Sequence, residues 1–92
     1  MDFGPDDEIE HDDPIPPYRQ LAAILRAQIQ RGDYKPRRPI PSEERLVQDF
    51  GLSRPTVRKA IRVLVDEGIL FVVPQRGTYV AEKPAGSADA AD

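Results

Sequence analysis

Apolar side chains recur with a helical period in three stretches of this chain. Between residues 17 and 31 they fall at i, i+3, i+4 and i+8, namely at Leu21, Ile24, Leu25 and Ile29. This spacing puts one apolar stripe on an amphipathic helix. Pro16 and Pro17 suit the start of the helix, and Gly32 suits its end. The pattern therefore predicts a first helix that packs one face into a core.

A second, shorter helix is expected after a proline-rich connector. Residues 35–41 hold three prolines, which predicts an extended connector with a short edge strand at 38–40. Ser42 is a suitable N-cap, and the two acids that follow it occupy the first turn, where the helix dipole favours negative charge. Gly51 ends the helix, whose apolar face is formed by Leu46, Val47 and Phe50.

The third helix is predicted over residues 53–67, followed by a hairpin. Ser53 caps it, and its core stripe consists of Val57, Ala60, Ile61, Leu64 and Val65. Two β-rich runs, 69–73 and 77–81, flank a turn at 74–76. Two helices joined by a short turn and followed by a hairpin predict a winged helix-turn-helix. The expected class is α+β, mainly α, with three helices and a two-stranded β-hairpin wing.

Charge divides the chain into three parts although the net charge is only -3. Residues 1–13 hold seven acids and no base, whereas residues 14–81 hold twelve Arg and Lys against six Asp and Glu. Acidic blocks with few apolar residues are typical of disordered tails. We therefore expect an acidic disordered tail at 1–14, a basic domain at 15–81 and a flexible tail at 82–92.

Composition excludes several classes of function. The absence of cysteine rules out disulfides and thiolate metal sites, and no apolar run is long enough for a membrane span. The single histidine, His11, lies in the expected acidic tail, so neither a metal site nor an enzyme is expected. No export signal is visible. We therefore expect a cytoplasmic protein without cofactors.

The third predicted helix has the side chains expected of a helix that recognises DNA. A helix fits the major groove, its first turn presents free amides to phosphate, and arginines can fork onto guanine. Arg58 and Thr56 are expected to read base edges. Contacts to the DNA backbone are expected from the second helix, the third helix and the wing tip. Gly77 at the wing tip lets the protein backbone approach the DNA closely. The residues expected to make these contacts are Ser42, Arg45, Ser53, Arg54 and Arg76.

Five ordered motifs between residues 15 and 81 resemble the N-terminal domain of the GntR-type bacterial transcription regulators. They are Pro17 to Leu21, Ile40 to Glu43, Leu52 to Ala60, Leu64 to Gly68 and Arg76 to Val80. The resemblance implies a winged helix, a homodimer on inverted-repeat double-stranded DNA, and repression. By position, the motifs match groove and phosphate contacts at Ser53, Arg54, Thr56 and Arg58, and the wing tip at Arg76 and Gly77.

The chain also departs from the family pattern in three places. Glu44 stands where an arginine that touches DNA is common, and Gln75 stands where a glycine is common. The first wing strand, 71–73, is apolar rather than basic. The family also carries a sensing domain after the wing, whereas this sequence ends eleven residues past it. We therefore expect no small-molecule effector domain in this chain.

Two alternatives remain at the level of sequence. Winged helices also serve as protein-interaction modules, and an apolar strand at 71–73 with acidic tails would suit one. Separately, the acidic residues 1–13 are expected either to keep the protein soluble or to compete with DNA for the basic face. In the second case, their removal would tighten non-specific DNA binding at low salt.

Overall fold

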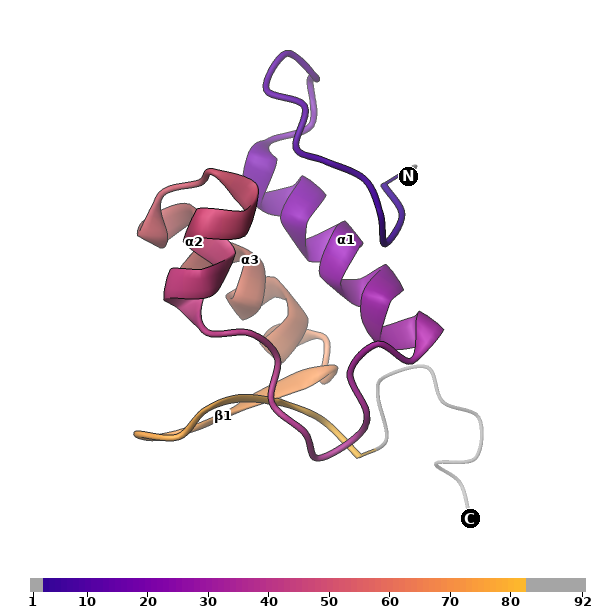
Figure 1. Cartoon of the computed structure of the whole chain (residues 1–92), viewed down its shortest axis with the longest axis vertical. Coiled ribbons are helices and arrows are strands. Elements are labelled where there is room, and N and C mark those ends of the chain that lie inside the picture. The colour runs from indigo at the N-terminus through magenta and orange to yellow at the C-terminus, as the bar shows by residue number, and fades with distance from the viewer. Residues whose placement is uncertain (1–2, 83–92) are drawn as a thin grey trace.

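A computed structural model describes residues 3–82 as three helices followed by an antiparallel hairpin (Figure 1). The elements are α1 (Pro17–Arg31), α2 (Glu43–Phe50), α3 (Arg54–Asp66), β1 (Leu70–Val73) and β2 (Gly77–Val80). Leu70 pairs with Val80 at one end of the hairpin, and Val73 pairs with Gly77 at the other. The winged helix-turn-helix predicted from the sequence is confirmed. The third helix is one residue shorter at each end than predicted, and each strand is one residue shorter at one end.

The helix boundaries follow local chemistry. The Ser42 and Ser53 hydroxyls each accept a hydrogen bond from the backbone amide three residues on, which caps α2 and α3. Gly32 and Gly51 end α1 and α2 with φ of 95° and 67°, a backbone conformation that a side chain disfavours. Pro17 occupies the first turn of α1, where its missing amide costs no helical hydrogen bond.

The core lies where α1 crosses α3 and the hairpin closes one end. The largest fully buried apolar side chains come from all three helices and from β2, namely Leu21, Ile24, Leu25, Leu46, Val57, Leu64 and Val80. The predicted stripes of the first and third helices therefore face each other, which fixes the orientation of α3 against the rest of the domain.

The proline-rich connector runs beside β2 and extends the hairpin. Pro39 forms an isolated antiparallel bridge with Tyr79, and the backbone amide of Ile40 donates to the carbonyl of Thr78 at 2.9 Å. The amide of Val80 in turn donates to the carbonyl of Arg38. The short edge strand expected at 38–40 thus exists as a bridge, and it ties the start of α2 to the wing.

The acidic N-terminal segment, for which composition predicts a disordered tail at 1–14, has contacts with α1 in the structure. Residues 3–16 fold back along α1, where the buried side chain of Gln20 holds them. Its Oε1 accepts from the amide of Glu10 at 2.8 Å, and its Nε2 donates to the carbonyls of Glu10 and Ile15 at 2.9 and 2.7 Å. Ile9 also packs against the core cluster. Buried polar and apolar partners on α1 therefore offset the charge repulsion within the segment.

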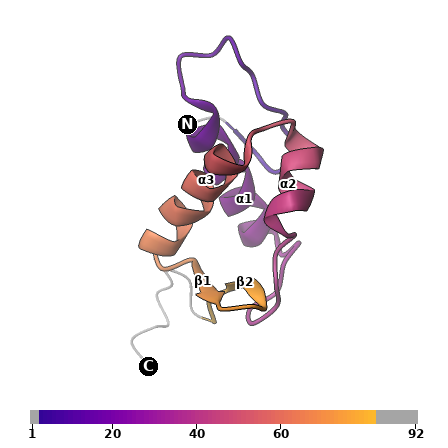
Figure 2. The same cartoon turned by 90° about the vertical axis from the view of Figure 1, so that its left-hand side faces the viewer.

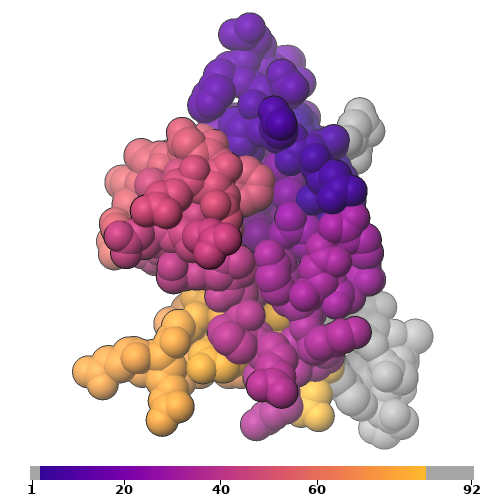
Figure 3. Space-filling model, in the orientation of Figure 1, coloured from indigo at the N-terminus to yellow at the C-terminus, as the bar shows by residue number. Residues whose placement is uncertain are grey.

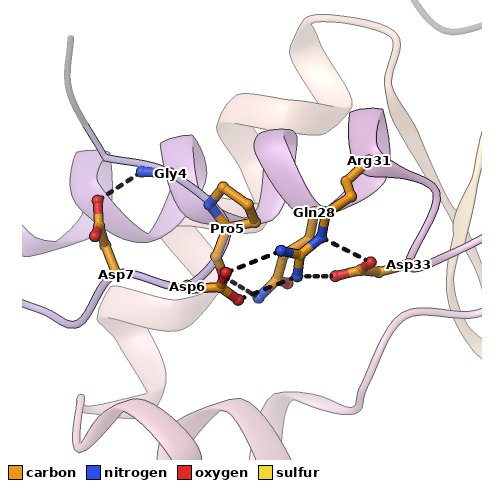
Figure 4. A network of polar contacts seen from close by, with 7 residues as sticks. All are labelled: Gly4, Pro5, Asp6, Asp7, Gln28, Arg31 and Asp33. Carbon is orange, nitrogen blue, oxygen red and sulfur yellow. Dashed lines mark hydrogen bonds and ion pairs between the residues drawn. The ribbon is translucent and has the colours of Figure 1, made fainter.

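An ion-pair network fastens the other end of this segment to α1 (Figure 4). The carboxylate of Asp6 accepts hydrogen bonds from both terminal nitrogens of Arg31, at 3.0 and 3.2 Å, and the side chain of Gln28 donates to the carbonyl of Pro5. Asp33 also binds Arg31, and these two carboxylates raise the pKa of the guanidinium while Arg31 lowers the pKa of Asp33. Of the C-terminal tail expected at 82–92, residues 83–92 lie outside the described part of the chain.

Candidate nucleic-acid interface

The basic first half of α3 and the hairpin lie on one side of the molecule, with α1 behind them (Figure 2). Arg54, Arg58 and Arg62 recur four residues apart on α3, and all three are exposed. Val57, Ala60 and Ile61, which lie between them in the sequence, are buried, so the arginines form an outward stripe opposite the core. This arrangement presents the N-terminal half of α3, with its positive dipole end, to an incoming ligand.

Two of these arginines converge on one carboxylate from α2. Glu43 accepts from Nε of Arg58 with both oxygens, at 3.0 and 3.1 Å, and lies 3.4 Å from Nη1 of Arg54. The Glu43 side chain is 32% exposed, while those of Arg54 and Arg58 are 48% and 64% exposed. The pairs are therefore largely solvated, and screening keeps their contribution to stability small.

The hydroxyl residues at the helix starts form local hydrogen bonds. Ser53 Oγ donates to Thr56 Oγ1 at 2.9 Å and accepts from the Thr56 amide at 3.3 Å. Ser42 Oγ accepts from the amide of Arg45, whose guanidinium turns along α2 to Asp49 at 3.2 Å. The guanidinium of Arg45 thus pairs within its own helix, whereas Arg54 and Arg58 of α3 pair with a residue of α2.

An open groove separates the start of α2 and α3 from the hairpin. It measures about 480 Å³, and it appears in Figure 3 as the hollow between the α2 and α3 lobe and the hairpin. Four of the residues singled out from the sequence line it, namely Ser42, Arg54, Arg76 and Gly77. A second hollow, of about 410 Å³, is lined by Arg58 and Arg62. Both hollows share Glu43, Val72 and Thr78.

The hairpin tip combines an exposed charge with unusual backbone. Arg76 is exposed, and its amide donates to the carbonyl of Val73 to close the turn. Gly77 has φ of 131°, and a Cβ built there would meet no atom within 4 Å. Gln75 adopts φ of 67°, a conformation in which glycine carries no steric penalty. The turn therefore needs its glycine for backbone geometry, and the space around it is open.

Sequence reasoning missed two features of this surface. Glu43 was interpreted only as an acid that suits the first turn of a helix, because nothing in sequence spacing links it to residues 11 and 15 positions later. Lys59 places its ammonium 4.4 Å from the ring centroid of Tyr18, and Arg19 lies 5.5 Å from the same ring. This cation–π cluster joins α3 to the start of α1 and extends the basic surface.

The acidic segment lies away from the arginines of α3. The ion pair of Asp6 is with Arg31 at the far end of α1, and Glu8 and Ile9 line a hollow together with Asp49 and Phe50 of α2. Within residues 3–82, no carboxylate of this segment pairs with Arg54 or Arg58. The structure therefore gives no direct contact through which the segment would compete with DNA at that stripe.

Three helices, a wing and an exposed arginine stripe on the second helix of a helix-turn-helix define a winged-helix domain. The family described as "Bacterial regulatory proteins, gntR family" matches residues 7–80, and the chain belongs to this family. The match begins inside the acidic segment that docks on α1. Membership of a family of regulatory proteins agrees with the expectation that the chain is not an enzyme.

Relatives and solved structures support the same assignment. The chain is 43% identical over 74 residues to the HTH-type transcriptional repressor NagR of Bacillus subtilis, covering 80% of this chain and 30% of that protein. It is 48% identical over 68 residues to the mannosyl-D-glycerate transport/metabolism system repressor MngR of Escherichia coli, covering 74% of this chain and 28% of that protein. The chain thus spans about 30% of the length of these curated relatives.

Two solved structures match the fold over most of both chains. The AraR DNA-binding domain in complex with operator ORR3 aligns with a TM-score of 0.73 and 39% identity, covering 82% of this chain and 90% of that one. YtrA from Sulfolobus acidocaldarius, a GntR-family transcription factor, aligns with a TM-score of 0.73 and 35% identity, covering 80% of this chain and 78% of that one. Among residues 3–82, no helix has the length and apolar character needed to cross a membrane.

Proposed function

We propose that this chain binds double-stranded DNA in a sequence-specific manner and acts in the cytoplasm as a transcription repressor. The observation that carries the proposal is the exposed arginine stripe of α3, set across an open groove from a hairpin tip that carries Arg76. Matching structures of AraR are complexes with operator DNA, and NagR and MngR are named repressors. An α-helix with this charge pattern fits the major groove.

In the proposed complex, α3 enters the major groove and the wing follows the flanking backbone. Arg58 and Thr56 read base edges from the first two turns of α3. Ser42, Ser53, Arg54 and Arg45 contact phosphates, and the hydroxyls can do so while they cap their helices. For Arg45, binding requires its guanidinium to leave Asp49. Arg76 contacts the flanking DNA where Gly77 permits close approach.

Two copies of the chain are proposed to bind an inverted repeat. A single α3 reads only a few base pairs, whereas a two-fold dimer reads two half-sites one helical turn apart or a multiple of that. Selection of bound sequences from a random duplex pool tests binding, symmetry and spacing together. The expected result is a palindromic consensus with a guanine at a fixed position in each half-site. A pool without enrichment would contradict sequence-specific binding.

Arg58→Ala is the sharpest single test of the proposed readout. Loss of a bidentate contact to guanine costs about 1–3 kcal/mol and relaxes the preference at that base. Arg62→Ala, which removes an arginine of the same stripe one turn further along α3, is the comparison variant and should leave the preference at that base intact. A gel shift in which Arg58→Ala binds the selected duplex as well as the native chain would refute this role.

A docking module for another protein is the second candidate, because β1 exposes apolar side chains. Phe71 and Val72 are 39% and 57% exposed, and Phe71 stacks on Tyr79 with ring centroids 5.9 Å apart. Salt dependence separates the two functions, since DNA binding driven by phosphate contacts weakens steeply with salt. Salt-insensitive association with a protein, without duplex binding, would favour docking.

A further inference from the structure

We propose that Glu43 is a positioning and specificity-determining residue for DNA binding: it holds Arg58 by Nε and weakens the attraction of Arg54 and Arg58 for phosphate. The inference rests on the proposed function of α3. It starts from the convergence of both arginines on one carboxylate, with distances of 3.0, 3.1 and 3.4 Å. Glu43 also lines both hollows beside α3, so it lies within the proposed contact surface.

The hydrogen-bond pattern leaves the reading end of Arg58 available. Both oxygens of Glu43 accept from Nε, and within residues 3–82 neither Nη of Arg58 has a hydrogen-bond partner. The two Nη groups can therefore still form the fork that recognises O6 and N7 of guanine. A guanidinium held by Nε also loses less rotational freedom on binding than a free one, which favours the base contact.

The negative charge of Glu43 acts differently on contacts to base edges and on contacts to phosphates. Guanine O6 and N7 are neutral acceptors, so a nearby carboxylate does not repel them as it repels a phosphate. Non-specific binding consists essentially of phosphate contacts, so Glu43 should weaken it more than it weakens specific binding. A carboxylate is also a suitable acceptor for N4 of cytosine. Glu43 and Arg58 together therefore suit recognition of a G·C pair. At the same time, Glu43 disfavours phosphate contacts, which do not depend on the DNA sequence.

Glu44 offers a matched control in the same first turn of α2. It is exposed and lines the first of the two hollows beside Glu43, and within residues 3–82 it forms no ion pair. Glu44→Gln therefore removes the same charge, from nearly the same place along the helix dipole, without touching either arginine. Glu43→Asp keeps the charge but shortens the side chain by one methylene, so it tests the hold on Arg58 separately from the repulsion.

The experiment measures affinity for two probes, the duplex selected by the native chain and a scrambled duplex of the same composition. Glu43→Gln should bind the scrambled duplex several-fold more tightly at low salt, and the ratio of specific to scrambled affinity should fall at least about fivefold. Glu43→Asp should lower the ratio without tightening scrambled binding. Glu44→Gln should change both affinities alike and leave the ratio intact.

The outcomes separate this inference from the proposed function. If Arg58→Ala lowers the ratio but Glu43→Gln behaves like Glu44→Gln, the role of Glu43 is refuted while the readout by α3 stands. If Arg58→Ala leaves the ratio unchanged, the proposed readout itself is refuted. Circular dichroism melts check that each variant is folded, and Glu43→Asp decides the question if Glu43→Gln does not fold.

Discussion

Replacing Gln20 by alanine tests whether the N-terminal segment is part of the folded domain. The Gln20 side chain is fully buried and forms three hydrogen bonds to the backbone of Glu10 and Ile15, between 2.7 and 2.9 Å. Each such bond contributes about 0.5–1.5 kcal/mol net, so the variant should lose about 2–4 kcal/mol of unfolding free energy. For a domain of this size, that corresponds to a fall in Tm of roughly 10–25 °C.

The same helix supplies two controls of the same residue type. Gln28 donates one hydrogen bond to Pro5 while its buried Oε1 has no partner, so Gln28→Ala should cost about 1 kcal/mol or less. Gln30 is exposed, and Gln30→Ala should leave the unfolding free energy within about 0.5 kcal/mol of the native value. Because all three changes are Gln to Ala within α1, differences in helix propensity largely cancel.

Urea unfolding followed by circular dichroism gives the three free energies, and hydrogen exchange gives the local effect. The amide of Glu10 should be protected in the native chain and should exchange rapidly in Gln20→Ala. Equal destabilisation by all three replacements would refute the reasoning. A Gln20→Ala variant with native stability would do the same, because it would mean that residues 3–16 do not depend on the Gln20 contacts.

Three further predictions concern the wing, a phosphate contact and pH. Gly77→Ala should cost about 1–3 kcal/mol in urea unfolding, through backbone strain at φ of 131° alone, since no atom lies within 4 Å of the new Cβ. Arg45→Ala should weaken binding to the selected and scrambled duplexes alike, and should lower the slope of affinity against salt by about 1. Arg31 lowers the pKa of Asp33 below 3.8, so the stability that its carboxylate contributes is present above about pH 4 and is lost as pH falls through the lowered pKa. Asp33→Asn should remove that acid-dependent loss from urea midpoints measured between about pH 2 and 6; an unchanged profile would contradict it.

The sequence alone determined the helices, their ends and the wing, because these depend on neighbours within a few positions. Ser42 and Ser53 cap the helices that were predicted to start there, and Gly32 and Gly51 end theirs. Apolar residues at helical spacing made the stripes that meet in the core. Motifs in order along the chain were sufficient to predict the family to which the chain belongs.

Tertiary structure decided which charges meet. No local rule places Glu43 beside Arg54 and Arg58, because their contact depends on the angle at which α2 crosses α3. Composition also says nothing of where the acidic segment lies: seven acids predict a solvated tail, whereas in the structure the buried amide of Gln20 and the apolar side chain of Ile9 contact it on α1. Partners so far apart in sequence become neighbours only when the core packs, which is why the pattern along the chain could not reveal them.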